Sequence, residues 1–386
     1  MTHNRGWTGV LLGAALLCGW VRPFGSDTAA PRTPSPDFTS LALWHIAGQG
    51  RGRPVVHGDA VYFLSKGHEV LAVDTVSGAL RWRRRTGEPG TTTMGTSIVA
   101  TGSVLVAGDY NLVAFARDSG VLRWRFTPHD GYAPGIYLGE AADDVVFAGS
   151  PSGRLYAIDG ESGAERWSSS SVLGPAETVF QPIVVHDLVV AAYTTFSAPN
   201  AGGVAAYDRH SGAEKWRTPF VRGGGANLPA GSGGGPVAVN DLVIAASADG
   251  TIHAFDQGNG RIRWSIPTAA QSGESEFRPL ATAGRTLAAG SLSGCVTAYD
   301  LGTRVERWRY CDRDGASVAF AIACDDRNVY VPYYEGRLIA IDIDSGKERW
   351  RIGGGPDSGF NWLPAVDGDR LYVGASTAGF FAFRRP

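Results

Sequence analysis

The sequence predicts an all-β protein, an eight-bladed β-propeller built of four-stranded antiparallel blades. A hairpin motif, Ala-x-Asp-x-x-x-Gly-x-x-x-Trp, recurs along the 386-residue chain. The Trp residues that end successive motifs are 42, 43, 49, 48, 44 and 42 residues apart, which is the period of a four-stranded propeller blade. Between the motifs lie short alternating runs and turn residues without any helical period. These observations together fix the fold class.

Each motif reads as a strand, a turn and a second strand, because the alternating first half is followed by turn residues of the Asp-Ser-Gly type. The complete copies are Ala72–Trp82, Ala157–Trp167, Ala206–Trp216, Ala254–Trp264 and Ala340–Trp350. Two further copies are degenerate. Ala114–Trp124 has Ala116 in place of Asp, and Ala298–Trp308 has Arg304 in place of Gly.

The two ends of the chain supply the eighth hairpin. Phe380–Arg384 is the first half of a motif and stops before any Trp, whereas Leu41–Ile46, which contains Trp44, is a second half without a first. We expect the N-terminal strand to complete the last blade, because this closure removes an open sheet edge.

Two strands are expected before each hairpin. From blade one to blade eight they are Pro54–Val56 and Ala60–Ser65, Ser97–Ala100 and Ser103–Ala107, Ile136–Glu140 and Val145–Ala148, Ile183–Val185 and Leu188–Ala192, Val237–Val239 and Leu242–Ala246, Leu280–Thr282 and Thr286–Ala289, Ser317–Ala323 and Val329–Tyr333, and Leu363–Val366 and Leu371–Gly374.

The N-terminal residues differ from the repeats. Arg5 precedes an apolar run from Trp7 to Val21, so residues 1–30 read as a signal peptide or a retained N-terminal anchor, and lipidation at Cys18 is an alternative. Residues 31–40 form a Pro-rich linker, and residues 41–386 form the propeller. We therefore expect an exported protein, periplasmic or extracellular, that contacts a membrane only through its N-terminal segment.

Composition excludes some functions. The net charge is −2, which argues against a nucleic-acid partner, and the basic run Arg81–Arg85 reads as a solvated strand end. The eight His residues show no metal-ligand spacing, and no Gly-rich phosphate loop joins a strand to a helix.

Two insertions point to one face of the ring. Thr194–Gly203 lengthens blade four, and Gly223–Gly235 lengthens the entry to blade five. In up-and-down blades the connection from the second to the third strand and the connection to the next blade lie on the same face. Because variable loops carry function on a rigid scaffold, we expect this face to be the working face.

The motif resembles the hairpin of the PQQ-like, or quinoprotein-type, β-propeller repeats, and the resemblance extends over the whole chain after residue 40. In length and simplicity the chain is most similar to the BamB-type outer-membrane assembly propellers, which bind a protein partner and catalyse no reaction. The resemblance implies that the repeated indoles pack between neighbouring blades as structural residues: Trp44, Trp82, Trp124, Trp167, Trp216, Trp264, Trp308 and Trp350. The repeated Asp is expected to accept hydrogen bonds from the backbone of its own turn.

A second branch of the same family consists of alcohol dehydrogenases that hold pyrroloquinoline quinone (PQQ) and calcium. That branch uses two adjacent cysteines, and this chain has no such pair. Its calcium site needs clustered oxygen ligands. No spacing links the candidates, Glu177, Glu274, Glu276, Asp312, Asp314, Asp357 and Asn361. We therefore expect no bound cofactor and no metal, and keep a PQQ- and calcium-dependent dehydrogenase as the alternative.

Aromatic and Arg side chains in the loops are candidates for binding a protein partner, because such residues dominate interface energies. They are Tyr132, Tyr137, Phe277, Arg278, Phe360 and Trp362. The favoured function is a monomeric, non-enzymatic scaffold that binds a protein through this face. An extracellular ligand-sensing propeller is a further alternative.

The cysteines allow one disulfide. Cys295 begins a strand of the blade-six hairpin and Cys311 ends the partner strand, so pairing about the turn places Cys295 opposite residue 310 or its neighbour. We expect Cys295 to bond with Cys311 and Cys324 to remain a buried thiol.

Overall fold

The computed structural model describes residues 38–87, 97–108, 111–129, 136–169, 177–195, 202–220, 235–247, 250–267, 279–291, 293–312, 318, 321–353, 359–360 and 362–386. The chain divides into two compact units, Met1–Pro34 and Ser35–Pro386, and all described residues belong to the second. Among the described residues, no helix has the length and apolar character to cross a membrane.

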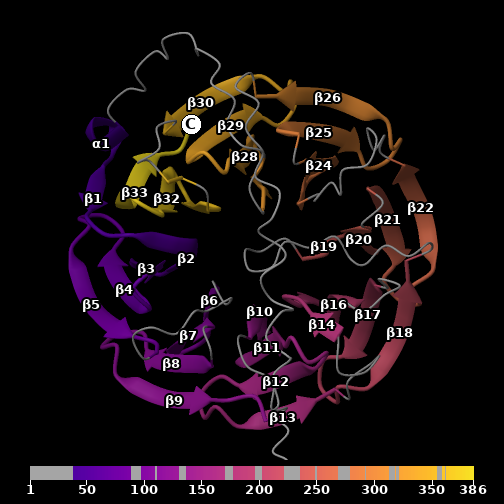
Figure 1. Cartoon of the computed structure of the whole chain (residues 1–386), viewed down its shortest axis with the longest axis horizontal. Coiled ribbons are helices and arrows are strands. Elements are labelled where there is room, and N and C mark those ends of the chain that lie inside the picture. Colours follow the sequence, from indigo (N-terminus) through magenta and orange to yellow (C-terminus); the bar gives the residue numbers. More distant parts are fainter. Residues whose placement is uncertain are drawn as a thin grey trace, which may run out of the picture. The chain divides into compact units, whose positions relative to one another are not determined.

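The second unit is the predicted eight-bladed propeller, with eight antiparallel sheets arranged in a ring (Figure 1). Blades one to four comprise β2 (Gly50–His57), β3 (Ala60–Ser65), β4 (Glu69–Asp74), β5 (Leu80–Arg85), β6 (Ile98–Ala100), β7 (Val104–Gly108), β8 (Leu112–Ala116), β9 (Leu122–Phe126), β10 (Tyr137–Ala142), β11 (Val145–Gly149), β12 (Leu155–Asp159), β13 (Glu165–Ser168), β14 (Glu177–Val179), β15 (Ile183–Val185), β16 (Leu188–Thr195), β17 (Gly202–Asp208) and β18 (Glu214–Pro219).

The remaining blades follow the same order. They comprise β19 (Val237–Val239), β20 (Leu242–Ala246), β21 (Thr251–Asp256), β22 (Ile262–Pro267), β23 (Leu280–Ala283), β24 (Thr286–Gly290), β25 (Cys295–Asp300), β26 (Glu306–Cys311), β27 (Ala323–Cys324), β28 (Asn328–Pro332), β29 (Arg337–Asp342), β30 (Glu348–Gly353), β31 (Ala365–Asp367), β32 (Arg370–Ala375), β33 (Gly379–Arg384) and, from the N-terminal side, β1 (Trp44–Ile46).

The eighth blade is closed by both chain ends, as the sequence predicts. Strand β1 pairs with β33 in antiparallel register, with Trp44 opposite Ala382 and Ile46 opposite Phe380. The edge of β33 is therefore covered, which leaves no break in the ring.

Three local details differ from the predictions. A four-residue helix, α1 (Phe38–Leu41), takes the place of the start of the first strand. The inner strand of blade four is split into β14 and β15, because Pro182 between them lacks an N–H group. The inner strand of blade seven contains only Ala323–Cys324, and Val318 forms an isolated bridge with Tyr333 instead of continuing the strand. The strand ends at Cys324 because Asp325 accepts the backbone N–H groups of Arg327 and Asn328 and forms a turn there.

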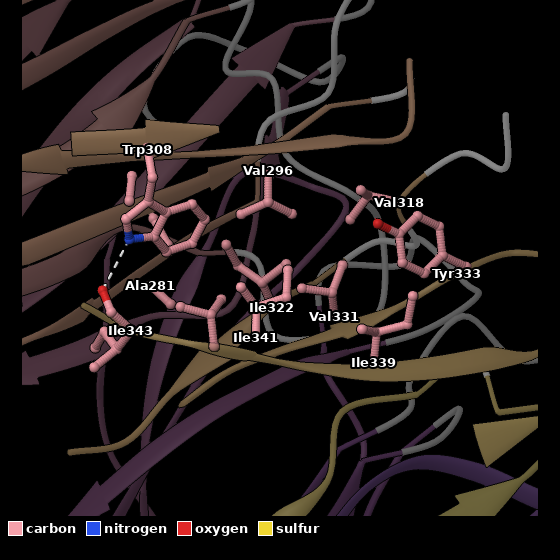
Figure 2. Packing of buried hydrophobic residues seen from close by; sticks show 13 residues of the cluster. Ala281, Val296, Trp308, Val318, Ile322, Val331, Tyr333, Ile339, Ile341 and Ile343 are labelled. Carbon is pink, nitrogen blue, oxygen red and sulfur yellow. Dashed lines mark hydrogen bonds between the residues drawn. The ribbon is translucent and has the colours of Figure 1, made fainter. Parts of the chain in front are cut away.

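The hydrophobic core lies between neighbouring blades. Figure 2 shows the layer between blades six and seven, where Val296 and Trp308 of one blade face Val331 and Ile341 of the next. The other clusters of buried residues likewise combine side chains from two adjacent sheets, for example Tyr62 of blade one with Leu105 of blade two. Each blade is therefore stabilised by its two neighbours.

Candidate functional site

The order of strands gives the ring two different faces. In every blade the hairpins between the first and second strands and between the third and fourth strands lie on one face, which we call the turn face. The connections between the second and third strands, and from each blade to the next, lie on the other face, which we call the loop face. Both sequence insertions fall in loop-face connections, after β16 and after β18.

The turn face repeats one hydrogen-bonding arrangement. In blade three, Asp159 Oδ1 accepts the backbone N–H and the hydroxyl of Ser162, both at 2.8 Å, and Oδ2 accepts from Arg166 at 2.7 Å. The Arg166 guanidinium, followed by the Ser162 donors, lowers the pKa of Asp159 to about 2. The same carboxylate role recurs at Asp74, Asp208, Asp256, Asp300 and Asp342.

The motif Trp residues connect the blades on this face. The indole N–H of Trp308 donates to the carbonyl oxygen of Ile343 in the next blade at 2.9 Å (Figure 2). A Cβ placed on Gly346 would lie 2.6 Å from the same ring. Equivalent hydrogen bonds to a backbone carbonyl oxygen are donated by the indole N–H groups of Trp44, Trp82, Trp124, Trp167 and Trp216. These Trp residues therefore join each blade to the next, whereas the repeated Asp residues accept hydrogen bonds within their own hairpins.

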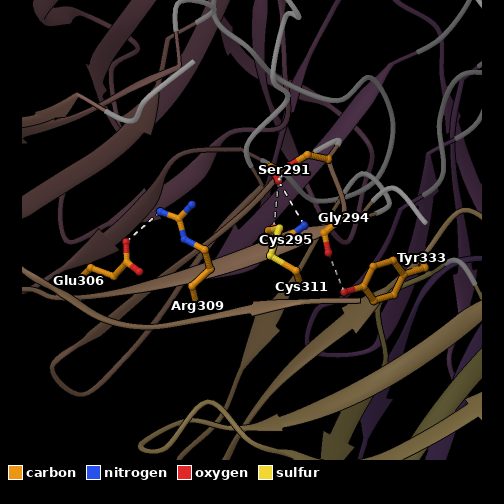
Figure 3. Close-up of a disulfide and its surroundings, with 8 residues drawn as sticks. Ser291, Gly294, Cys295, Glu306, Arg309, Cys311 and Tyr333 are labelled. Carbon is orange, nitrogen blue, oxygen red and sulfur yellow. Dashed lines mark hydrogen bonds and ion pairs between the residues drawn. A yellow bond between two sulfur atoms is a disulfide. The ribbon is translucent and has the colours of Figure 1, made fainter. Parts of the chain in front are cut away.

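The loop face at blade six is anchored by a disulfide (Figure 3). Cys295 lies directly opposite Cys311 across β25 and β26, and the structure joins their sulfur atoms. Cys324 is a free thiol whose burial raises its pKa to about 12. Tyr333 of blade seven donates its hydroxyl to the carbonyl of Gly294, beside the disulfide, at 3.2 Å.

A buried ion pair follows the disulfide in the chain. Asp312 comes directly after Cys311, and its carboxylate side chain has no exposed surface. It lies 2.8 Å from the guanidinium of Arg337, which is also buried, and 3.5 Å from that of Arg351. A buried carboxylate is stable only when it is paired in this way. This pair joins blade six to blade seven at the loop face.

The rim of the loop face at blades seven and eight carries two aromatic side chains. Tyr334, in the connection between β28 and β29, is 38% exposed. Trp362, in the connection entering blade eight, is half-buried, and its indole nitrogen has no hydrogen-bond partner in the described part of the chain. The two connections are joined, because Phe360 donates its backbone N–H to the carbonyl of Gly336 at 3.1 Å. We call Tyr334 and Trp362 the aromatic rim.

Two residues predicted to bind a partner are in fact part of the core. Tyr137 is 4% exposed and lies 5.6 Å from the ring of Phe180, and Phe360 is fully buried 5.4 Å from the ring of Phe381. Their expected exposure is wrong, because both side chains turn inward and fill space between blades. The other candidates, Tyr132, Phe277 and Arg278, lie outside the described residues. Tyr334 was not among the candidates, although it stands beside a strand end as the second Tyr of a pair.

Most of the candidate calcium ligands lie outside the described residues. Among the described residues, no group of three His, Cys, Asp or Glu side chains is placed to hold a metal ion. Of the seven oxygen-ligand candidates, Asp312 forms ion pairs with Arg337 and Arg351. Glu177 lies in β14, and the other five candidates, Glu274, Glu276, Asp314, Asp357 and Asn361, lie outside the described residues. The expectation of no bound cofactor and no metal therefore stays a prediction.

Comparisons with known proteins match the propeller fold and point to one family. Over residues 33–195 and 200–385 the chain matches the family model described as "Outer membrane protein assembly factor BamB". The protein of that name from Bordetella pertussis is 22% identical over 90% of this chain and 79% of its own length. The protein of that name from Kangiella koreensis is 31% identical over 30% of each chain, so the match spans under a third of that relative.

Solved structures show the same fold. The crystal structure of BamB from Moraxella catarrhalis has a TM-score of 0.68 and 19% identity, and the match covers 89% of this chain and 99% of that one. A quinohemoprotein alcohol dehydrogenase from Comamonas testosteroni also has a TM-score of 0.68, with 13% identity over 89% of this chain and 76% of its own. The likeness to both structures shows the propeller alone, whereas the family match over most of the chain is specific: this chain belongs to the BamB family of outer membrane protein assembly factors.

Proposed function

We propose that this chain is an exported, non-enzymatic propeller that binds a protein partner through its loop face, as a scaffold of the BamB kind. The observation that carries the proposal is the aromatic rim. Tyr334 and Trp362 lie on the loop face of a protein whose relatives are named as assembly factors. Aromatic side chains on a rigid support are favoured anchors in protein interfaces.

The support beneath the rim is rigid for physical reasons. Phe360, two residues before Trp362, is fully buried, and its ring lies 5.4 Å from that of Phe381 and 6.3 Å from that of Phe383. Arg337, which begins the strand after Tyr334, is tied to Asp312 by the buried ion pair. A preorganised surface loses little conformational entropy on binding, which favours affinity.

Export is supported by two features. An apolar run from Trp7 to Val21 follows Arg5, in the manner of a signal peptide or anchor. The Cys295–Cys311 disulfide suits an oxidising compartment such as the periplasm. We propose that the propeller is a monomer and that any membrane contact is made by the N-terminal segment.

Capture of partners from the host envelope tests the proposal. Purified chain and the variants Trp362→Ala and Tyr334→Ala are immobilised, and the captured proteins are compared by quantitative mass spectrometry. We expect a defined protein to be lost from both variants, with affinity reduced about 30-fold for a loss of about 2 kcal/mol. The matched control is Val305→Ala, which removes an exposed apolar side chain from the turn face. Equal capture by all four proteins would contradict the proposal.

The dehydrogenase alternative has its own test. We expect no dye-linked oxidation of alcohols or sugars after PQQ and calcium are added to the purified chain. Binding of PQQ at micromolar affinity together with turnover would replace the scaffold proposal by the enzymatic one.

A further inference from the structure

The turn that carries Tyr334 is built differently from the corresponding turns of other blades. Tyr333 donates its backbone N–H to the carbonyl of Arg337 at 2.8 Å and so closes the turn between β28 and β29. In blade three the same backbone bond joins Ser150 to Arg154, and there the Ser150 hydroxyl also accepts the N–H of Arg154 at 3.3 Å. A Ser hydroxyl bonds the backbone of the corresponding turn at Ser65, Ser247 and Ser291. In blade seven Tyr333 occupies this position, and its hydroxyl stands at the far end of the ring, so it cannot make that local bond.

Blade six holds both ends of the Tyr334 turn instead. The Tyr333 hydroxyl donates to the carbonyl of Gly294 at 3.2 Å (Figure 3). At the other end of the turn, the buried guanidinium of Arg337 lies 2.8 Å from the buried carboxylate of Asp312. The same guanidinium lies 5.9 Å from the centre of the Tyr333 ring, which links the two ends. The position of Tyr334 between them therefore depends on two points of blade six.

The disulfide joins these two points. Gly294 directly precedes Cys295, and Asp312 directly follows Cys311. The two cysteines lie opposite each other, where β25 begins and β26 ends, and their sulfur atoms are bonded (Figure 3). Strand ends open more readily than strand centres when no cross-link holds them. The bond therefore keeps the two contacts with the Tyr334 turn at a fixed spacing.

The disulfide is open to attack, whereas the hairpin does not depend on it alone. Cys311 is exposed and Cys295 is partly exposed, and exposed disulfides are the ones that are reduced most readily. On the same outer strand, Trp308 and Tyr310 donate hydrogen bonds to blade seven at 2.9 and 2.6 Å. We therefore expect the reduced protein to stay folded and to loosen at the strand ends.

We propose that the Cys295–Cys311 disulfide is a redox switch that sets the order of the Tyr334 turn and, through it, the affinity for the protein partner. The second step rests on the proposed function, which assigns Tyr334 to the binding surface. The reductant is a dithiol. One of its thiolates attacks the Cys311 sulfur and expels the Cys295 thiolate, and its second thiolate then expels the Cys311 thiolate and leaves the reductant as a disulfide. Both cysteine thiolates take up protons, and an oxidising disulfide reverses the exchange.

Hydrogen exchange of the whole chain, measured by mass spectrometry with and without dithiothreitol, tests the inference without a partner. We expect the amides of residues 333–337 to exchange about threefold to tenfold faster after reduction, because one hydrogen bond changes a local opening equilibrium by about that factor. Residues 150–154 form the internal control, since their turn has its own Ser hydroxyl and lies in blade three. Unchanged exchange at 333–337, or an equal rise in both turns, would overturn the inference.

Variants show whether the effect runs through the disulfide and its contact with the turn. The double variant Cys295→Ala with Cys311→Ala should exchange fast at 333–337 whether or not dithiothreitol is present. Tyr333→Phe removes only the hydroxyl that donates to Gly294, so its oxidised form should exchange faster than the oxidised parent and respond less to reduction. Thermal melting checks that each variant is folded. A double variant that still responds to dithiothreitol, or a Tyr333→Phe variant that behaves like the parent in both states, would contradict the inference.

Capture of the partner separates this inference from the proposed function. Reduction should weaken capture by the parent about threefold to tenfold, in line with the loosened turn, and should not change capture by the double cysteine variant. Capture that Tyr334→Ala reduces but that reduction leaves unchanged would overturn the regulation, while the proposed function stands. Capture that Tyr334→Ala does not reduce would contradict the proposed function and, with it, the regulation of binding. The exchange rates at 333–337 tell the two failures apart, because they do not depend on a partner.

Discussion

The turn face and the loop face of the ring are built from the same strands but follow different rules. On the turn face one arrangement of Asp, Gly and Trp recurs, and it solves the same problem of packing one blade against the next each time. On the loop face the features differ from blade to blade: a disulfide at blade six, a buried ion pair between blades six and seven, and the aromatic rim at blades seven and eight. Repetition therefore marks stability in this molecule, and irregularity marks the candidate sites.

The largest effect is expected where the turn-face arrangement is assembled from the two chain ends. Deleting residues 41–46 removes β1 from the edge of β33 and removes the Trp44 indole, which donates to the carbonyl of Thr75 at 3.1 Å. We expect a large fall in melting temperature and aggregation through the open edge. Thermal melting and sedimentation velocity measure both. A truncated chain that melts and sediments like the full chain would show that this closure is dispensable.

The same substitution on the two faces sharpens the comparison. Trp308→Ala removes a buried side chain with a hydrogen-bonded indole, and we expect a loss of about 3–5 kcal/mol in unfolding free energy. Trp362→Ala removes a half-buried indole whose nitrogen has no partner in the described residues, so its loss should be clearly smaller. Urea unfolding measures both values, and equal losses would contradict the division into a structural and a binding face.

The repeated part of the structure could be predicted from sequence, because a fixed period of Ala, Asp and Trp specifies the hairpin and its neighbour. The number of blades and the closure by Leu41–Ile46 followed from that period and are confirmed. For residues outside the repeated motif, exposure or burial was harder to predict from the sequence. Tyr137 and Phe360 lie at or beside connections, where no alternation tells whether a ring turns outward or into the space between blades.

A pocket lined by the first strands of several blades could not be predicted for a related reason. A β-bulge inserts one residue and shifts the alternation of inward and outward side chains. Glu140 stands at such a shift, whereas the irregularity around Arg53 inserts two residues, so counting along one strand does not reveal that the two residues line the same pocket. A search for repeats also misses residues that occur in one blade only, such as Tyr334.

A loop-face prediction concerns the disulfide. The bond encloses a sequence separation of 16 residues, and closing a loop of that size stabilises a folded protein by about 3 kcal/mol. The double variant Cys295→Ala with Cys311→Ala should lose about that amount in unfolding free energy. Non-reducing peptide mapping of the parent should find Cys324 unpaired. A free Cys295 in oxidised protein would refute the bond.

Two glycines on the turn face isolate the contact with the indole. Gly346 and Gly284 have positive φ angles of 69° and 55°, so an Ala at either position is strained by the backbone. Only at Gly346 would the added Cβ also meet Trp308, at 2.6 Å, whereas nothing lies within 4 Å at Gly284. Gly346→Ala should therefore be less stable than Gly284→Ala by about 1–3 kcal/mol. Equal unfolding free energies would mean that the ring moves aside freely.

The smallest expected effect is the pH dependence of a turn-face carboxylate. The folded state lowers the pKa of Asp159 to about 2, chiefly through Arg166, from about 3.9 in an unfolded chain. The stabilisation is therefore present above about pH 4 and is lost as the pH falls through about 2. Because the pair is partly exposed, its contribution should be below about 1 kcal/mol. Asp159→Asn should lower the melting temperature slightly at neutral pH, and the difference from the parent should shrink on acidification. A difference that stays constant from about pH 6 to about pH 2 would show that the ionised carboxylate contributes nothing beyond the hydrogen bonds that Asn also accepts.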